Sequence, residues 1–156
     1  MYHHFSMGIE QDISQTRFRN EHHKAVVNFI YTYNWLNERL KVFFEAEGIT
    51  GQQFNILRIL RGAGKPISTL QIRQRMLDRM SDTSRIVDRM VIKGLVKKET
   101  CETDKRLVDV SITEKGRKLL EKFDLRQDEL DAVFSRLDAD EVAKLNAMLD
   151  KIRSVP

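Results

Sequence analysis

Apolar and polar residues recur with a helical period between residues 81 and 93 of the chain. At about 100° per residue, one side collects a core stripe of Thr83, Ile86, Val87, Met90 and Val91. The other side collects a polar face of Ser81, Ser84, Arg85, Asp88 and Arg89. The pattern predicts an amphipathic helix with Ser81 as its N-cap and Gly94 at its end.

A β-hairpin is predicted directly after this helix. Leu95 and Val96 start a strand, and a second strand alternates apolar Val108, Val110 and Ile112 with polar residues, as a half-buried strand does. The turn between the strands, residues 102–106, is charged and has no hydrophobic reason to fold back on the core. We therefore expect it to be solvated or bound to a partner.

Helical periodicity also covers most of the chain before residue 81. A long helix is predicted over residues 20–46, and a second helix opens at Thr50, which has capping-box spacing with Gln53. Ser68 and Gln71 repeat that spacing and start a short helix that ends near residue 76. Two short helices around a tight turn form a helix-turn-helix, and the hairpin makes it a winged helix. Residues 1–18 are polar and unpatterned, which predicts an arm that is loose or depends on a partner.

Thr113 is expected to cap a long helix with apolar positions as far as Leu137, and Asp138 with Glu141 opens a last helix that ends near Pro156. The predicted fold is mostly α with a small two- to three-stranded β-wing. We expect a single domain over residues 1–156. It divides into an arm and dimerisation helix (1–47), a winged helix-turn-helix (48–113) and C-terminal dimerisation helices (114–156).

Charge and composition narrow the function. The net charge of the whole chain is only +4, but residues 61–106 carry 12 Lys and Arg against 6 Asp and Glu, so the positive charge gathers around the predicted helix and wing. The single cysteine, Cys101, excludes an internal disulfide and fits a reducing cytoplasm. No run of about 18 apolar residues predicts a membrane span, and no secretory signal is expected.

Four segments resemble the MarR family (multiple-antibiotic-resistance regulators): GITGQQFNILRIL (48–60), SRIVDRMVIKGLV (84–96), TDKR (103–106) and SITEKGRKLL (111–120). The resemblance covers roughly residues 25–152. It implies a homodimeric bacterial transcription regulator, most often a repressor, that binds a pseudo-palindromic operator in double-stranded DNA. It also implies a small, often aromatic and anionic effector that releases the DNA.

The resemblance places the outer face of helix 81–93 in the major groove. Ser81, Asp82, Ser84 and Arg85 then meet base edges or nearby phosphates, and arginine suits bidentate contact with guanine. For Asp82, a structural role at the positive end of the helix dipole is favoured over base contact. Arg73, Arg75 and Arg89 are expected on phosphates. In the wing, Lys105 and Arg106 would reach DNA while Asp104 holds the tip in shape; Glu99 and Glu102 add negative charge where the family is commonly basic.

The apolar residues of the long helices are more than a small winged helix can bury, so a second copy of the chain is expected to cover them. The expected dimerisation residues are Phe29, Leu130, Val133, Phe134, Leu145, Leu149 and Ile152. Trp35 lies off the main stripe of its helix and is a candidate for an effector pocket.

The sequence gives less support for a metal site or for catalysis. Adjacent histidines (3 and 4, 22 and 23) diverge by about 100° on a helix, so they favour solvated side chains over a metal site, and no metal or cofactor is predicted. No phosphate loop or nucleophile motif is present, so no enzyme is expected. Two alternatives stay open: a winged helix used for protein–protein contact, and a metal- or redox-gated regulator of the same fold, with Cys101 as the redox candidate.

Overall fold

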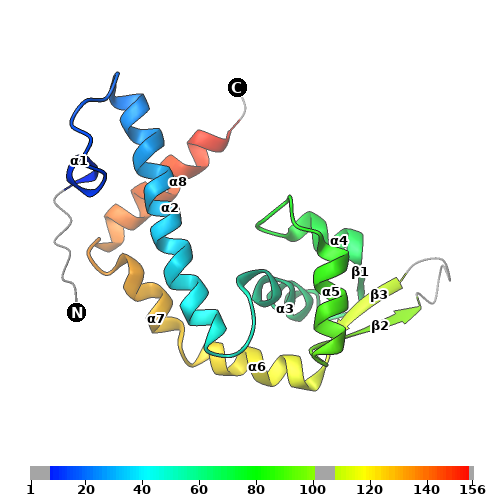
Figure 1. Cartoon of the computed structure of the whole chain (residues 1–156). Helices are drawn as coiled ribbons and strands as arrows, with labels where there is room; N and C mark the ends of the chain where they lie inside the picture. Colours follow the sequence, from blue (N-terminus) through cyan, green and yellow to red (C-terminus); the bar gives the residue numbers. More distant parts are fainter. Residues whose placement is uncertain (1–7, 101–107, 155–156) are drawn as a thin grey trace. The chain divides into compact units, whose positions relative to one another are not determined.

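The computed structural model describes residues 8–100 and 108–154 (Figure 1). It divides into two compact units, residues 1–42 and 43–156, which are treated separately below. The first unit holds α1 (Ile9–Asp12) and most of α2 (Glu21–Glu45). The prediction of a loose arm is wrong for part of its length, because residues 9–12 form a helical turn and Glu10 pairs with Lys24 of α2.

The second unit contains a winged helix followed by further helices. Its winged-helix elements are α3 (Gly51–Ala63), β1 (Ile67–Ser68), α4 (Thr69–Arg75), α5 (Thr83–Ile92), β2 (Val96–Thr100) and β3 (Val108–Ile112). After them come α6 (Glu114–Asp124), α7 (Gln127–Asp131), the 3-10 helix η1 (Ala132–Phe134) and α8 (Ala139–Arg153). The predicted fold class is confirmed. No helix of the described chain has the length and apolar character needed to cross a membrane.

The sheet has three antiparallel strands in the order β1-β3-β2. Val96 pairs with Ile112 across β2 and β3, and Ile67 of the two-residue β1 pairs with Val110. The hairpin strands match their predicted positions. β1 is too short to show a period of its own, so its place beside β3 was not visible in the sequence.

Helix α3 lies at the centre of the core and contacts α4, α5, α6 and β3. Its side chains Ile56, Leu57 and Leu60 are buried. An aromatic cluster lies at the end of α2: Phe43 and Phe44 contact Phe123 of α6, with ring centroids 5.3 and 5.7 Å apart, and Phe44 lies 4.7 Å from Phe54 of α3. Phe43 therefore packs within the single chain.

The predicted caps set several element boundaries. Both capping boxes of the winged helix are present, Thr50 with Gln53 and Ser68 with Gln71, and Asp138 with Glu141 caps α8 in the same way. Thr113 caps α6 by accepting a hydrogen bond from the Gly116 backbone N–H at 3.1 Å. These bonds satisfy backbone groups that the first helical turn leaves unpaired.

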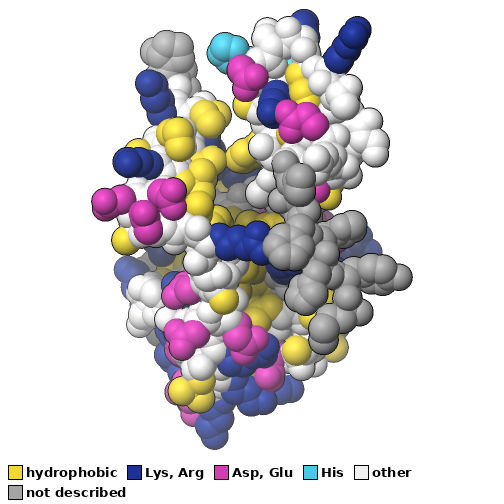
Figure 2. Space-filling model, turned by 90° about the vertical axis from the view of Figure 1, so that its left-hand side faces the viewer, with side chains coloured by type: hydrophobic (Ala, Val, Ile, Leu, Met, Phe, Trp, Pro, Cys, Tyr) yellow, Lys and Arg dark blue, Asp and Glu magenta, His cyan; other side chains and the backbone are white. Residues whose placement is uncertain are grey.

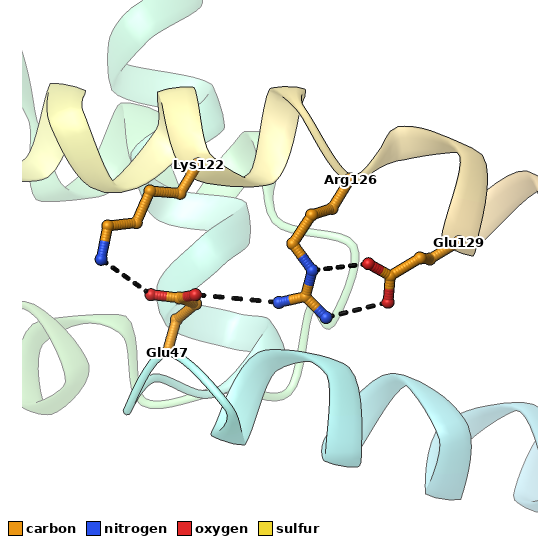
Figure 3. A network of polar contacts seen from close by, with 4 residues as sticks. All are labelled: Glu47, Lys122, Arg126 and Glu129. Atoms are coloured by element: carbon orange, nitrogen blue, oxygen red, sulfur yellow. Dashed lines mark hydrogen bonds and ion pairs between the residues drawn. The ribbon is translucent and has the colours of Figure 1, made fainter.

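The single long helix predicted after Thr113 is wrong, because α6 ends at Asp124 and α7 begins at Gln127. Charged contacts hold the chain at this break (Figure 3). Arg126 donates two hydrogen bonds to Glu129 at 2.7 and 2.9 Å, lies 3.8 Å from Glu47, and stacks 4.5 Å from the ring centre of Phe43. Apolar spacing alone carries no sign of such tertiary contacts.

Gly116 marks a close approach of α6 to Leu95, the residue before β2. A Cβ at this position would lie 2.3 Å from the Leu95 backbone oxygen. We expect Gly116→Ala to lower the free energy of unfolding by about 1–3 kcal/mol, as overpacking does. Gly62→Ala is the control, since its Cβ would meet nothing within 4 Å and should raise stability by up to about 1 kcal/mol. Urea unfolding measures both; equal effects of the two substitutions would contradict the close approach.

A bidentate pair joins α3 to α6: Arg61 donates to both oxygens of Asp124 at 2.5 and 3.0 Å. These bonds lower the pKa of Asp124 below its ordinary value. A lowered carboxyl pKa stabilises the fold above the unfolded-state pKa, and this contribution disappears as the pH falls through the folded-state pKa.

We therefore expect Arg61→Met to cost about 0.5–1 kcal/mol near neutral pH, the range of a partly exposed pair. The coupling between Arg61→Met and Asp124→Asn in a double-mutant cycle should begin to fall as the pH drops below about 4, the ordinary aspartate pKa, and should be lost once the pH passes below the lowered folded-state pKa of Asp124. Unfolding titrations at pH 7 and pH 3 provide the comparison. A coupling of the same size at both pH values would refute the assignment.

Candidate nucleic-acid interface

Helix α5 buries one face and exposes the other. Thr83, Ile86, Val87 and Met90 are buried, as predicted, while Ser84, Arg85, Asp88 and Arg89 are exposed. The prediction for Val91 is wrong: it is 38% exposed, because it lies at the border of the buried face near the helix end. The exposed polar face is thus fixed by the burial of the opposite one.

The N-cap of α5 is Asp82, so the prediction of Ser81 is wrong. The Asp82 carboxylate accepts a hydrogen bond from the Arg85 backbone N–H at 3.2 Å, which supports the structural role favoured for it. Ser81 is only 9% exposed, and its hydroxyl donates to the Asp78 carbonyl at 2.8 Å. Its hydroxyl is therefore committed to the turn before α5.

The turn between α4 and α5 contains no glycine, and side chains of the turn and of α3 hold it instead. Asn55 of α3 accepts a hydrogen bond from the Leu77 backbone N–H at 3.0 Å, and Gln52 donates to Asp78 at 2.8 Å. The second oxygen of Asp78 accepts from the Met80 backbone N–H at 3.0 Å. An aspartate within a short turn is the sequence signal that could have predicted this arrangement.

A hollow of about 440 Å³ lies between α4 and the start of α5. It is lined by Thr69, Leu70, Arg73, Met80 and residues 81–84. The structure therefore brings Arg73 together with Asp82 and Ser84. Arg75 is two residues further along α4 and is exposed, but it does not line this hollow. Leu70 and Met80 are exposed here, and the sequence analysis had not singled them out.

Acidic residues near the basic face have cationic partners. Asp88 of α5 accepts a hydrogen bond from Lys98 of β2 at 2.5 Å, and Glu99 pairs with Lys97 on the same strand. The first pair also ties the middle of α5 to the wing strand. These pairs reduce the negative potential beside Arg85 and Arg89, including the part that Glu99 adds where the family is commonly basic.

Cys101, Glu102, Asp104, Lys105 and Arg106 lie outside the described residues, as do His3 and His4. The described strands β2 and β3 lead to the tip. The roles expected for these residues stay predictions.

Several predicted dimerisation residues expose apolar surface in the single chain. Phe29 is 58% exposed and Ile152 76% exposed, and Phe134 is also exposed. Half-buried positions complete the set: Leu130, Val133, Leu145 and Leu149. Hydrophobic side chains appear among the charged ones on the surface in Figure 2. Such surface is typical of a contact with another protein chain.

The geometry adds no support for Trp35 as an effector contact or for His23 as a metal ligand. The Arg39 guanidinium lies 4.0 Å from the ring centre of Trp35, so one face of the indole already has a partner. His23 accepts a hydrogen bond from the Arg19 backbone N–H at 3.2 Å. Within residues 8–100 and 108–154, no group of three or more His, Cys, Asp or Glu side chains is arranged to hold a metal.

The helix-turn-helix, the three-stranded wing sheet and the exposed basic face of α5 together define a winged helix-turn-helix protein. The sequence profile of the MarR family matches residues 47–107. The multiple antibiotic resistance protein MarR of Salmonella typhimurium is 32% identical over 126 residues, which cover 79% of this chain and 87% of that protein. The chain belongs to the MarR family, whose members are DNA-binding transcription regulators and not enzymes.

Two further comparisons support the assignment to the MarR family. The HTH-type transcriptional regulator MhqR of Bacillus subtilis is 28% identical over 122 residues, covering 77% of this chain and 83% of that protein. A crystal structure of a mutant MarR from E. coli, complexed with operator DNA, superposes with a TM-score of 0.76 at 27% identity. The match covers 89% of this chain and 100% of that one.

Proposed function

We propose that this protein is a homodimeric transcription regulator that binds a pseudo-palindromic operator by inserting α5 of each copy into the major groove. One observation carries the proposal: burial of one side of α5 leaves Ser84, Arg85 and Arg89 on its outer face. Family membership supplies the class of target, since MarR of E. coli has been crystallised with operator DNA. The regulator works in the cytoplasm, where its DNA target is found.

The proposed DNA contacts are of two kinds, to phosphates and to base edges. Arg73, Arg75 and Arg89 contact phosphates, which supply most of the affinity and its dependence on salt. Ser84 and Arg85, near the start of α5, meet base edges and supply sequence choice. Asp82 acts as the helix cap, and Ser81 holds the turn. In the wing, Lys105 and Arg106 approach the DNA and Asp104 shapes the tip.

Residues 48–113 form the DNA-binding part, and residues 1–47 and 114–156 form the dimer interface. Two-fold symmetry places the recognition helices about one helical turn of DNA apart, near 34–36 Å. Ligand-responsive repression is typical of the family. A small-molecule effector that binds the mis-spaced dimer better would release DNA, by no more than its differential affinity for the two states. The use of this winged helix for protein contact alone is not favoured.

Arg85→Ala tests base reading. We expect it to weaken operator binding by about 1–3 kcal/mol and to relax specificity, whereas Arg89→Ala should weaken binding to all duplexes and reduce the salt slope by about 1. Fluorescence anisotropy with DNA from upstream of the protein's own gene and with a scrambled duplex, from about 50 to 200 mM salt, separates the two. Equal losses on both duplexes for Arg85→Ala would remove its reading role.

The dimer has a test of its own. Sedimentation at micromolar concentration should give twice the mass of the 18.3 kDa chain, because a single copy leaves Phe29, Phe134 and Ile152 exposed. Phe29→Glu should shift the distribution toward the monomer, since burying an unpaired charge in an interface is costly. A wild-type monomer across this range would rule out the two-fold operator geometry.

A further inference from the structure

The C-terminal end of α5 is closed in two ways. Its own backbone forms a Schellman motif: Gly94, at φ 70°, donates to the Val91 carbonyl at 2.9 Å, and Leu95 donates to the Met90 carbonyl at 3.0 Å. The Lys93 carbonyl lies outside this motif and accepts a hydrogen bond from the ammonium group of Lys115 on α6 at 2.7 Å. The α6 helix thus contacts the last backbone group of the recognition helix.

Lys93 also reaches in the opposite direction with its side chain. Its ammonium group donates to the Gly48 carbonyl at 2.7 Å and to the Gln53 side-chain oxygen at 3.1 Å. Gln53 is only 4% exposed, and the same oxygen accepts from the Thr50 backbone N–H in the α3 capping box. The contact therefore joins the end of α5 to the turn that starts α3.

Lys93 therefore bonds to two other parts of the fold. Its carbonyl accepts from Lys115 of α6, and its ammonium group donates to Gly48 before α3 and to Gln53 in the first turn of α3. Next to Lys93, the Thr113 hydroxyl donates to the Gly94 carbonyl at 2.7 Å. We call the hydrogen bonds of Lys93 to Gly48, Gln53 and Lys115 the lysine clamp. These groups lie at the end of α5 opposite Asp82 and Ser84.

We propose that Lys93 is a positioning residue that sets the angle at which α5 enters the DNA groove. The proposal rests on the function proposed above. A helix of 10 residues is about 15 Å long, so a tilt of about 5° at the clamped end moves the other end by about 1 Å. Bidentate contacts with base edges require a defined geometry, whereas phosphate contacts carry no sequence information. The lysine clamp therefore supports discrimination between sequences more than overall affinity.

The turn bonded by Lys93 is also connected to the C-terminal helices. The turn that accepts Lys93 also carries Glu47, which pairs with Lys122 at 3.1 Å and with Arg126 at the break between α6 and α7 (Figure 3). Glu47 and Gly48 are adjacent, so a shift of this turn reaches both the joint of the C-terminal helices and the end of α5. The contacts of Glu47 and the lysine clamp therefore lie on the same turn.

Lys118 is a matched control for Lys93. Both side chains line one hollow of about 570 Å³, together with Lys115 and Lys122. Lys118 lies on α6, one helical turn beyond Lys115. Replacing either lysine by methionine removes one positive charge and keeps a long, flexible side chain. A general loss of positive charge in this region would therefore affect both variants alike.

The experiment measures binding of wild type, Lys93→Met, Lys115→Met and Lys118→Met to an operator selected by the wild-type protein and to a scrambled duplex, across a salt series. We expect Lys93→Met and Lys115→Met to lose about three- to tenfold in operator affinity, as loss of a hydrogen bond allows. Their scrambled-duplex affinity and salt slope should match wild type, as should all values for Lys118→Met. The thermal midpoints of Lys93→Met and Lys115→Met should fall by a few degrees, because each loses hydrogen bonds within the folded chain. Lys93→Arg, which keeps a donor, should recover part of the loss.

Three results would overturn the lysine clamp: no loss for Lys93→Met, an equal loss on both duplexes, or a salt slope lowered by about 1, which marks a direct phosphate contact. If the wild type selects no operator, the proposed function fails instead. Amide hydrogen exchange of the free protein then tests the clamp alone. Faster exchange near the end of α5 in Lys93→Met supports it, and unchanged exchange in α5 refutes it.

Discussion

Burial of the apolar face of α5 is the constraint on which the rest of the structure depends. Val87 and Met90 are fully buried in the core around α3, so Arg85 and Arg89 must point outward. Rotation of α5 about its axis would expose these apolar side chains at a cost of about 1.5–3 kcal/mol each. The core therefore fixes which side chains the protein can present to DNA, and the hydrogen-bonded ends of α5 fix where they are presented.

The two ends of α5 are held by different parts of the fold. The first end is held by Asp82 and by a turn tied to Asn55 of α3, so α3 governs its position. The second end is held by Lys93 and Lys115, which connect it to the turn before α3 and to α6. The side chains proposed to read the DNA sequence lie at the first end, and connections to the helices expected to form the dimer lie at the second.

Periodicity and capping signals predicted most elements of the fold from the sequence. The face of α5, the capping boxes at Thr50 and Ser68 and the strands of the hairpin are local features, which nearby residues determine. The break after Asp124 and the hydrogen bonds of Lys93 to Gly48 and Gln53 were not predicted, because each depends on contacts between residues far apart in the chain. The shift of the cap from Ser81 to Asp82 has a local origin, because the Ser81 hydroxyl donates to the carbonyl of Asp78 in the turn before α5.

The most direct test of the account asks whether the protein reads the major groove. Each purine of a selected operator is replaced in turn by its 7-deaza analogue, which lacks the N7 acceptor that the major groove displays. The account predicts that affinity falls at purines clustered in two places about one helical turn apart, where the two copies of α5 enter. Affinity that stays unchanged at every purine would contradict it.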